Sequence, residues 1–295
     1  MAFYNLFVGN EAYISVKNNQ LKLKNAEKEE SFPIEDINSI LIENLQSYIS
    51  VYTLSKLAEN KVVVYICDEK HLPVAQLLPF YSHFSQSKIF KSQTDLAPPL
   101  RKNLWKEIVR HKIENQNRCL KLSGKDEILT PYLKKIKSDD ASNMEAVSAG
   151  VYFKELFGEK FARRQENSIN SALNYGYAIL RGVVARSIVC HGLLPFVGIK
   201  HSNTFNNFNL ADDLVEVFRP FVDLLVSENY DLKFNTEYKM LLFDLLNADC
   251  EIGGAKYALS YAVEIFVQSF SQSLFEKKNI LKFPVLQEIK RHQYE

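Results

Sequence analysis

The hydrophobic pattern of this chain changes its period near residue 96, and this change most constrains the fold. Before it, residues 12–17 and Gln20–Lys24 are short segments joined by Asn18 and Asn19, a pair that suits a β-hairpin turn. Residues 62–67 (VVVYIC) are apolar and mostly β-branched, which is typical of a buried strand. After residue 96, apolar residues recur at the spacing of one helix face. The pattern predicts an α+β chain, with a strand-rich part followed by a helical part.

The length of 295 residues is more than one ordinary core holds, so we expect two domains. We predict a strand-rich N-terminal domain over residues 1–85, with one helix near residues 51–58, and a linker over 86–98. An all-α C-terminal domain then covers residues 99–295, because Pro98 and Pro99 can open its first helix. Its further predicted helices cover residues 143–157, 169–190, 210–226, 236–247 and 254–275.

Basic and acidic residues almost balance, with 36 Lys and Arg against 35 Asp and Glu. The net charge of +1 excludes nucleic-acid binding through a global positive field, so any such site must be a local patch. The four cysteines contain no CxxC pair, and neither a thiolate zinc site nor a redox motif is readable. We find no signal-peptide pattern and no apolar run of membrane-spanning length, so we predict a cytoplasmic protein without membrane contact.

Several common catalytic motifs are absent, and one short acidic motif has a simple explanation. The sequence contains no GxxxxGKS/T, GxGxxG, GxSxG or HExxH motif. Asp68, Glu69 and Lys70 follow the predicted strand 62–67 and match the acid-x-Lys element of some restriction-type nucleases. We favour a charged turn here, because such short motifs often match by accident.

His201 lies in a polar loop, and two acids follow it closely in the sequence. Asp213 and Glu216 are three residues apart, so both carboxylates lie on one face if this segment is helical. Carboxylate oxygens with a single imidazole suit Mg²⁺ or Mn²⁺ better than a structural zinc ion. The alternative is a solvated acidic face beside a loop histidine, and spacing alone leaves both open.

Glu145 is a third candidate acid, at the start of a predicted helix of small and apolar residues. Ser142 stands three residues before it, which fits a capping box in which the glutamate bonds back to the cap residue. Taken alone, these residues favour the structural role of Glu145 over metal binding.

Basic residues gather in two places in the predicted helical domain. Residues 99–125 hold eight Lys and Arg against two Glu, and a second cluster lies at residues 163–164. Such faces are commonly just solvated, but a metal–carboxylate site that acts on phosphate needs neighbouring cations. We therefore predict DNA phosphate contacts from Lys106, Arg110, Lys112, Arg163 and Arg164.

Four ordered motifs carry a resemblance to a known family. They are EAxxAxxYF at residues 145–153, NxxLNYGYAxLR at 170–181, GLLPxxGxxH at 192–201 and DLVExFRP at 213–220. With these motifs the chain resembles the CRISPR-associated spacer-acquisition endonuclease, the universal integrase of CRISPR adaptation. Residues 104–116 resemble the compact versions found beside single-protein (type II) effectors, and the β half fits as well. The resemblance covers nearly the whole chain.

The resemblance implies an N-terminal β-sandwich-like domain and a helical domain that binds one divalent metal. We predict that the N-terminal domain makes the dimer and partner contacts, because every candidate ligand and most of the clustered basic charge lie beyond residue 98. The family's metal ligands are a glutamate, a histidine and a second acid, which fall on Glu145, His201 and Glu216. Mg²⁺ or Mn²⁺ is the expected ion. Asp213 falls where some members carry a supporting acid, and some relatives have aspartate at the position of Glu216. On this comparison Glu145 becomes a metal ligand.

An activity and a set of partners also follow from the resemblance. The expected enzyme is a metal-dependent DNA endonuclease and integrase. In it, a DNA 3′-hydroxyl attacks a phosphodiester at the CRISPR repeat boundary and inserts a short duplex as a new spacer. Family members are homodimers that a small second adaptation protein joins into a heterohexamer on double-stranded DNA, and the single-protein effector nuclease can take part. Two alternatives stay open: a general metal-dependent structure-specific repair nuclease, and a non-catalytic DNA-binding scaffold of the same fold.

Overall fold

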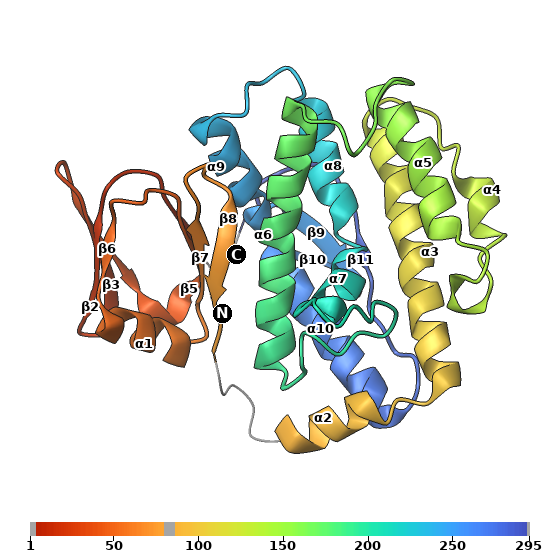
Figure 1. Cartoon of the computed structure of the whole chain (residues 1–295), viewed down its shortest axis with the longest axis horizontal. Helices are drawn as coiled ribbons and strands as arrows, with labels where there is room; N and C mark the ends of the chain where they lie inside the picture. The colour runs from red at the N-terminus through yellow and green to blue at the C-terminus, as the bar shows by residue number, and fades with distance from the viewer. Residues whose placement is uncertain (1–3, 80–85, 294–295) are drawn as a thin grey trace. The chain divides into compact units, whose positions relative to one another are not determined.

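The computed structural model of the protein describes residues 4–79 and 86–293 (Figure 1). The chain divides into two compact units, Met1–His83 and Phe84–Glu295, with mainly strands in the first and mainly helices in the second. The predicted α+β class is therefore confirmed. The predicted end of the first domain, at residue 85, lies outside the described residues. Over the described ranges, no helix is long and apolar enough to cross a membrane.

The first unit contains two four-stranded sheets, ordered β1–β5–β7–β8 and β4–β3–β2–β6. In the first sheet β1, β5 and β7 are parallel, and β8 is antiparallel to β7. One hydrophobic core collects side chains from both sheets and from α1, among them Leu21, Ile40 and Leu57, as expected of a β-sandwich-like domain with one helix. The elements are β1 (Tyr4–Val8), β2 (Tyr13–Lys17), β3 (Gln20–Lys24), β4 (Glu29–Pro33), the 3₁₀ turn η1 (Ile34–Asp36), β5 (Ile37–Ile42), β6 (Tyr48–Ile49), α1 (Val51–Glu59), β7 (Val63–Cys67) and β8 (Pro73–Leu77).

The predicted hairpin joins β2 and β3 through Asn18 and Asn19. Both asparagines have positive φ, 53° and 57°, which a two-residue type I′ turn requires and which asparagine tolerates better than most residues. Lys17 pairs with Gln20 across the turn. The hairpin prediction is thus confirmed.

The second unit is built around α6, the 23-residue helix that runs through its middle in Figure 1. α6 packs against α7, α8, α9 and α10, and α3 packs against α5 and α8. Gly176 lets α6 and α8 approach closely, because a β-carbon there would lie 2.5 Å from Cγ1 of Val222. The helices are α2 (Gln86–Thr94), α3 (Pro98–Leu122), α4 (Thr130–Leu133), η2 (Ser138–Asp140), α5 (Met144–Phe157), α6 (Ser168–Cys190), α7 (Asn209–Val215), α8 (Arg219–Glu228), α9 (Thr236–Asp244), η3 (Leu245–Asn247) and α10 (Leu259–Glu276).

The second unit is not all-α as predicted, because it contains a small antiparallel sheet ordered β10–β9–β11. Its strands are β9 (Asp249–Ile252), β10 (Ala255–Ala258) and β11 (Pro284–Val285). Gly253 and Gly254 have positive φ, 63° and 83°, and form the tight turn between β9 and β10. The helix predicted from residue 254 therefore begins only at Leu259.

The helix predicted over residues 210–226 is two helices in the structure. α7 ends at Val215 and α8 begins at Arg219, with Pro220 in its first turn. Proline lacks the N–H that a continuous helix would need, so it starts a new helix more readily than it continues one. The break leaves Glu216 at the C-terminal cap of α7, just before Arg219 at the start of α8.

The segment 86–98, predicted as a linker, contains α2 and belongs to the second unit. Its sequence has few apolar positions, which is why the helical pattern is weak. Tertiary contacts hold the helix instead: Ile89 and Gln93 are buried, and the amide of Gln93 donates to the carbonyls of Leu194 and Val197 at 3.0 and 2.7 Å. α2 thus anchors the segment that leads to His201.

Candidate metal centre

Two glutamates from different helices converge on one lysine in the second unit. Glu145 lies in the first turn of α5, and Glu216 follows the last residue of α7. Nζ of Lys112, on α3, donates to Oε1 of Glu145 and lies 2.5 Å from Oε2 of Glu216. Lys112 and Glu216 are each 5% exposed, so this part of the cluster is almost wholly out of water. The structure brings two of the three predicted ligands together around a positive charge.

The start of α5 is capped by Asp140 and not by the capping box. The Asp140 carboxylate accepts hydrogen bonds from the backbone N–H groups of Met144 (2.8 Å) and Glu145 (2.9 Å). The hydroxyl of Ser142 instead donates to a backbone carbonyl seven residues earlier, at 2.8 Å. The capping-box alternative for Glu145 is therefore wrong, because another carboxylate satisfies the helix N-terminus.

His201 and Asp213 form a second pair. Nδ1 of His201 lies 2.7 Å from Oδ1 of Asp213, and the same carboxylate accepts from the backbone N–H groups of Ile199, Lys200 and His201 at 2.7–3.0 Å. Asp213 is completely buried. Its oxygens thus hold the loop and orient the imidazole. With Nδ1 engaged, Nε2 is the His201 nitrogen that can ligate a metal.

The surroundings of His201 raise the pKa of its imidazole above the ordinary value. The hydrogen bond to Asp213 is the largest cause, burial opposes it, and the negative charges of Asp213, Glu216 and Asp212 reinforce it. The negative charge of Glu216 therefore acts on His201, so the Glu145–Glu216 pair and the His201–Asp213 pair interact electrostatically. Trp105, on α3, packs edge-to-face with the imidazole at 6.1 Å between ring centroids.

Glu216 stays ionised in spite of its burial. Burial raises the pKa of Glu216, but the positive charges of Arg219 and Lys112 outweigh it and lower the pKa overall. For Lys112, burial lowers the pKa, while the charges of Glu216 and Glu145 raise it more strongly. Nη2 of Arg219 lies 3.3 Å from Oε1 of Glu216. Two cations therefore share this buried carboxylate.

Arg219 is held in place by a network that joins three helices. Its guanidinium carbon lies 4.9 Å from the ring centre of Tyr177 on α6. The Tyr177 hydroxyl donates to Oδ1 of Asp223 on α8, and the Tyr152 hydroxyl from α5 donates to Oδ2 at 3.0 Å. Burial raises the pKa of Asp223 to about 6. This network fixes α5, α6 and α8, and with them Glu145 and Arg219.

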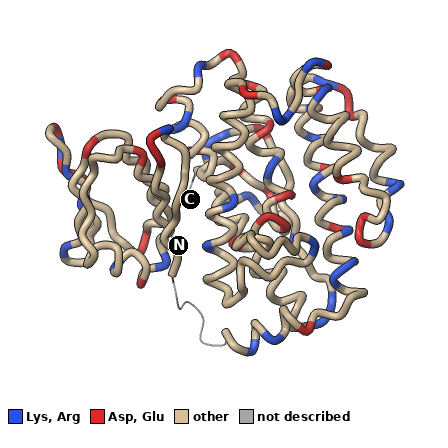
Figure 2. Tube along the Cα trace, viewed as in Figure 1, with Lys and Arg blue, Asp and Glu red and all other residues tan. Residues whose placement is uncertain are grey.

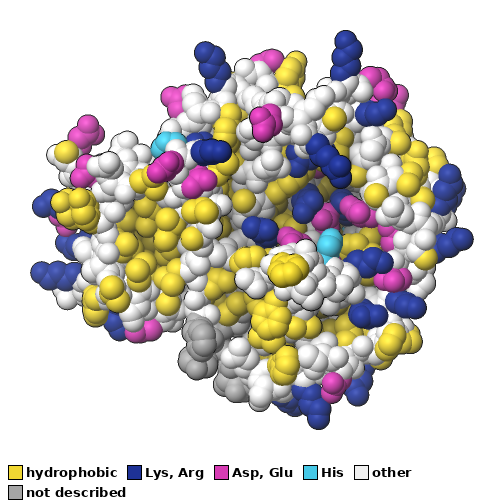
Figure 3. Space-filling view, viewed as in Figure 1, with side chains coloured by type: hydrophobic (Ala, Val, Ile, Leu, Met, Phe, Trp, Pro, Cys, Tyr) yellow, Lys and Arg dark blue, Asp and Glu magenta, His cyan; other side chains and the backbone are white. Residues whose placement is uncertain are grey.

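The donor types of the predicted ligands suit a hard divalent cation, but the structure does not bring all three to one point. Within residues 4–79 and 86–293, no group of three or more His, Cys, Asp or Glu side chains is placed to hold a metal ion. Glu145 and Glu216 do direct oxygens at one cation, the Lys112 ammonium, so a small cation fits between them. Nε2 of His201 would complete the set. Figure 3 shows a histidine with acidic and basic side chains around a hollow of this unit.

The loop that carries His201 borders a cavity of about 390 Å³, whose lining includes Gly198, His201 and Asn203. The amide of Asn209 donates to three backbone carbonyls of the loop at 2.9–3.2 Å and keeps it compact. The ring of Phe205 stands out from the loop, 95% exposed. The half-exposed imidazole therefore faces space that a substrate can enter.

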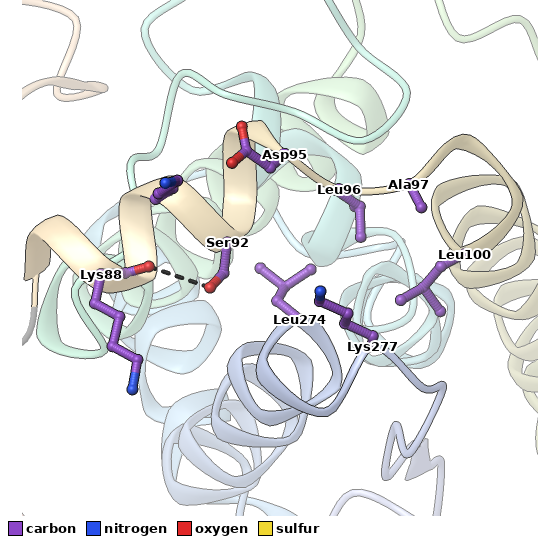
Figure 4. A pocket seen from close by; sticks show the side chains of 9 residues that line it. Lys88, Ser92, Asp95, Leu96, Ala97, Leu100, Leu274 and Lys277 are labelled. Carbon is purple, nitrogen blue, oxygen red and sulfur yellow. Dashed lines mark hydrogen bonds between the residues drawn. The ribbon is translucent and has the colours of Figure 1, made fainter.

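A further cavity of about 320 Å³ lies between α2, the start of α3 and the end of α10 (Figure 4). Leu100, Leu274 and Lys277 are among its lining residues. None of the predicted site residues lines it, so it is separate from the candidate metal centre.

Lys112 does not lie where a surface phosphate contact would need it. It is buried between the two glutamates, so the structure differs from the prediction for this residue. Lys112 follows Leu104 and Ile108 at i, i+4 spacing, on the buried face of α3. A lysine inside an apolar stripe is the sequence signal that could have indicated its buried ion pair.

The other predicted phosphate contacts are at or near the surface. Lys106 and Arg110 are half-buried on α3, and Arg164 is exposed. Arg163 is engaged within the unit, because it donates to Asn174 at 2.8 Å and also to a second asparagine. Figure 2 shows basic and acidic residues interspersed along the trace, in line with the balanced net charge.

Sequence reasoning missed three residues that build the centre: Asp140, Arg219 and Trp105. Arg219 follows Glu216 by three residues, a spacing that favours an ion pair and could have indicated it. Asp140 caps α5 from a left-handed turn with φ 48°, and no local pattern predicts this. Trp105 comes from a helix far away in the sequence, so its contact with His201 is visible only in the fold.

The acidic turn at residues 68–70 has a structural role. Oδ1 of Asp68 accepts from the backbone N–H groups of Lys70 and Leu72, both at 2.9 Å, and so closes the connection between β7 and β8. These bonds accord with the charged-turn interpretation and leave the acid-x-Lys motif without support.

Comparison with known sequences places the chain among the CRISPR-associated proteins. Residues 6–236 match the family described as CRISPR associated protein Cas1. The chain belongs to the Cas1 family, and the predicted resemblance is confirmed. It is 36% identical to the CRISPR-associated endonuclease Cas1 of Neisseria meningitidis over 304 aligned positions, which cover all of both chains.

Solved structures share the fold of the whole chain. A casposase bound to integration product aligns with a TM-score of 0.76 at 23% identity, covering 95% of this chain and 92% of its own. A chain of a Cas6-RT-Cas1–Cas2 complex aligns with a TM-score of 0.72 at 17% identity, covering 97% of this chain and 36% of its own. At these identities the likeness shows the fold alone.

Proposed function

We propose that this chain is a divalent-metal-dependent DNA endonuclease and integrase of CRISPR adaptation, which inserts short duplex DNA into the repeat array. The observation that carries the proposal is the convergence of Glu145 and Glu216 on one cation, within electrostatic reach of an imidazole that Asp213 orients. Membership of the Cas1 family and the full-length likeness to an endonuclease of N. meningitidis support it.

The residues of the centre would either bind the metal ion or position and balance its ligands. Glu145, His201 and Glu216 would hold Mg²⁺ or Mn²⁺, which supplies Lewis-acid stabilisation of negative charge on a phosphodiester. Asp213 keeps the proton on Nδ1 of His201, so that Nε2 presents a lone pair. Arg219 contacts Oε1 of Glu216 and offsets its negative charge. Oε2 of Glu216, which contacts Lys112 on the side of Glu145, is not occupied by Arg219.

The proposed reaction is phosphoryl transfer without a covalent enzyme intermediate. The 3′-hydroxyl oxygen of the incoming duplex bonds to the phosphorus at the repeat boundary and releases its proton to solvent. The bond from that phosphorus to the 3′ oxygen of the repeat strand breaks, and the leaving oxygen takes up a proton. Water in place of the 3′-hydroxyl gives hydrolysis, which is the endonuclease activity.

An integration assay tests the proposal against its two alternatives. A labelled short duplex is incubated with a repeat-bearing plasmid, with and without Mn²⁺ and with and without the small partner protein. We expect label joined to the plasmid at the repeat boundary, only when metal is present. Cleavage without joining would favour a repair nuclease. Binding without either product would favour a non-catalytic scaffold.

The first unit carries exposed aromatic and apolar side chains that suit contacts with other protein chains. We expect a cytoplasmic homodimer that forms through the first unit, joined by the small adaptation protein into a heterohexamer on double-stranded DNA, with the effector nuclease able to take part. Exposed side chains on that unit support this: Tyr13 and Tyr48 are each 58% exposed and stack at 5.0 Å, and Val51 is 82% exposed. A solved Cas6-RT-Cas1–Cas2 complex, one chain of which shares this fold, also supports it.

Light scattering on the purified chain measures this assembly. The expected mass is twice that of the chain alone, and a larger complex should form when the small partner is added. Tyr48→Lys should shift the dimer toward monomer, because it places a charge in a stacked aromatic pair. A wild-type monomer at all concentrations would contradict the dimer.

Arg110→Gln and Arg164→Gln should each weaken DNA binding, because each removes a phosphate contact whose contribution to the binding constant depends on the salt concentration. Each lost phosphate contact should reduce the slope of log K against log salt by about 0.9, with little change in sequence preference. Lys106→Gln should act alike. Arg163→Gln should mainly lower the melting temperature, because its guanidinium is bonded within the unit. Titrations of a labelled duplex at four salt concentrations measure the slopes, and unchanged slopes would contradict the phosphate contacts.

Metal binding should weaken as the pH falls through the pKa of His201. Only the neutral imidazole ligates a metal, and the bond to Asp213 raises this pKa above its usual value, so the loss begins at a higher pH than for a free histidine. Mn²⁺ titrations from pH 5.5 to pH 8.5 measure the effect. His201→Ala should bind more weakly and lose this pH step. An unchanged wild-type affinity across this range would contradict a ligand role for His201.

A further inference from the structure

The Lys112 ammonium occupies the place where the two candidate carboxylates meet. Nζ contacts Oε1 of Glu145 and lies 2.5 Å from Oε2 of Glu216. The two acids reach it from separate helices, so the lysine on α3 is the group that joins them. The lysine side chain is 6% exposed, which leaves little room for a hydration shell.

The arrangement is stable only while these opposite charges stay together. A buried ammonium without a partner is costly, and two facing carboxylates without a cation repel each other. Arg219 contacts the other oxygen of Glu216, Oε1, at 3.3 Å, so it does not bridge to Glu145. Lys112 is therefore the cation that the two carboxylates share.

We propose that Lys112 is an internal counter-cation that closes the metal position in the metal-free protein and withdraws when a divalent ion enters. This inference rests on the proposed metal site at Glu145 and Glu216. One small volume between two carboxylates does not hold an ammonium and a divalent ion together, because the two cations repel and share the same oxygens. The lysine has a flexible four-carbon stem that can move its charge while α3 stays in place.

The consequence is competition between lysine and metal. The wild-type protein must give up two charge-assisted contacts before the ion is bound, and this lowers its apparent metal affinity. A structural ion pair that stayed beside the metal would have the opposite consequence, because losing it would disorder the carboxylates and weaken metal binding. The direction of the change in affinity therefore separates the two roles.

Mn²⁺ binding by the full chain tests the proposal by calorimetry. Lys112→Met and Lys112→Gln should bind Mn²⁺ about tenfold more tightly than wild type, or better. Without metal their melting temperatures should fall, and Mn²⁺ should raise them more than it raises that of wild type. Lys102→Met, at an exposed position on the same helix, is the matched control and should equal wild type in both measurements.

Amine labelling of the wild-type protein gives a second readout that needs no Lys112 variant. An acetylating reagent should leave Lys112 nearly unmodified in the metal-free protein and modify it at least about tenfold faster with Mn²⁺ bound, whereas exposed Lys102 should not change. Equal or weaker Mn²⁺ affinity in the Lys112 variants would overturn the inference and leave the metal site standing. If those variants do not fold, an unchanged labelling rate overturns it. No Mn²⁺ binding by wild type or by the variants would overturn the proposed function as well.

Discussion

Glu145→Ala, His201→Ala and Glu216→Ala should each abolish integration and nuclease activity, by about three orders of magnitude or more. Residues that act on one metal fail as a unit, so each single loss should nearly equal the triple loss. The three variants should differ in stability. Glu216→Ala leaves Lys112 and Arg219 facing each other without their shared carboxylate, so its melting temperature should fall most. Integration, Mn²⁺ binding and thermal melting are measured side by side.

Conservative substitutions at Glu145 and Glu216 separate the loss of negative charge from the loss of the whole side chain. Glu145→Gln should also be inactive, because Asp140 caps α5 and leaves the glutamate no capping task that glutamine could take over. Glu216→Asp should keep part of the activity, because aspartate retains the charge. Glu159→Ala, at a side chain 86% exposed just after α5, is the matched control and should behave as wild type. Full activity with unimpaired Mn²⁺ binding in Glu145→Gln would remove Glu145 from the centre.

The larger elements of the fold were predictable because their patterns are local. The two asparagines of the β2–β3 turn and the apolar stripes of α3, α5 and α6 lie within the segments that they define. α2 was missed because its sequence carries little helical signal and Gln93 holds it from another part of the chain. β10 was missed because it ends at Ala258 and runs directly into α10, so the predicted helix from residue 254 included it. β9 lies in the short stretch between two predicted helices, where no strand was predicted.

The candidate site divides in the same way. The sequence motifs identified Glu145, His201, Asp213 and Glu216 as candidates. In the structure Glu145 and Glu216 meet at Lys112, and His201 contacts Asp213. Their spacing could not say that Asp213 turns both oxygens toward the loop and His201, since that depends on how residues 199–201 fold over α7. Nor could a count of basic residues distinguish the buried Lys112 from the less buried Lys106 and Arg110, because burial is set by the helices packed on α3.

α3 contributes two side chains to the candidate centre, and the sequence of α3 alone does not predict this. The helix supplies Trp105 against His201 and Lys112 between the glutamates. Both side chains come from its buried face, which also carries apolar residues such as Ile108 and buried polar ones such as Gln116. The position of α3 therefore determines how the two pairs face each other, and the proposed metal site depends on the packing of α3 on α5 and α8.

The second large effect is expected at Asp213, which touches no substrate in the proposal and yet holds the centre together. Asp213→Ala removes a completely buried carboxylate and four hydrogen bonds, three of them from backbone N–H groups, of which that of Ile199 is in a buried residue. We expect a loss of about 3 kcal/mol or more in the free energy of unfolding. Integration should fall with it, because His201 loses its orientation. Asp213→Asn should fold better than Asp213→Ala, yet its amide can donate to Nδ1 and move the proton to Nε2, the nitrogen that we propose as the metal ligand.

Gly198 offers an independent way to disturb the same loop without touching a charged group. A β-carbon there would lie 2.3 Å from the carbonyl oxygen of His201 and 2.7 Å from Oδ2 of Asp213, so Gly198→Ala must shift the loop or the carboxylate. We expect it to weaken Mn²⁺ binding and integration nearly as much as Asp213→Asn. Gly150→Ala, in α5 with open space around the new methyl group, is the matched control and should raise stability by about 0.5–1 kcal/mol with full activity. Wild-type Mn²⁺ affinity in Gly198→Ala would show that the loop can shift without loss of binding. The contact of Asp213 with residues 199–201 would then not be what positions His201.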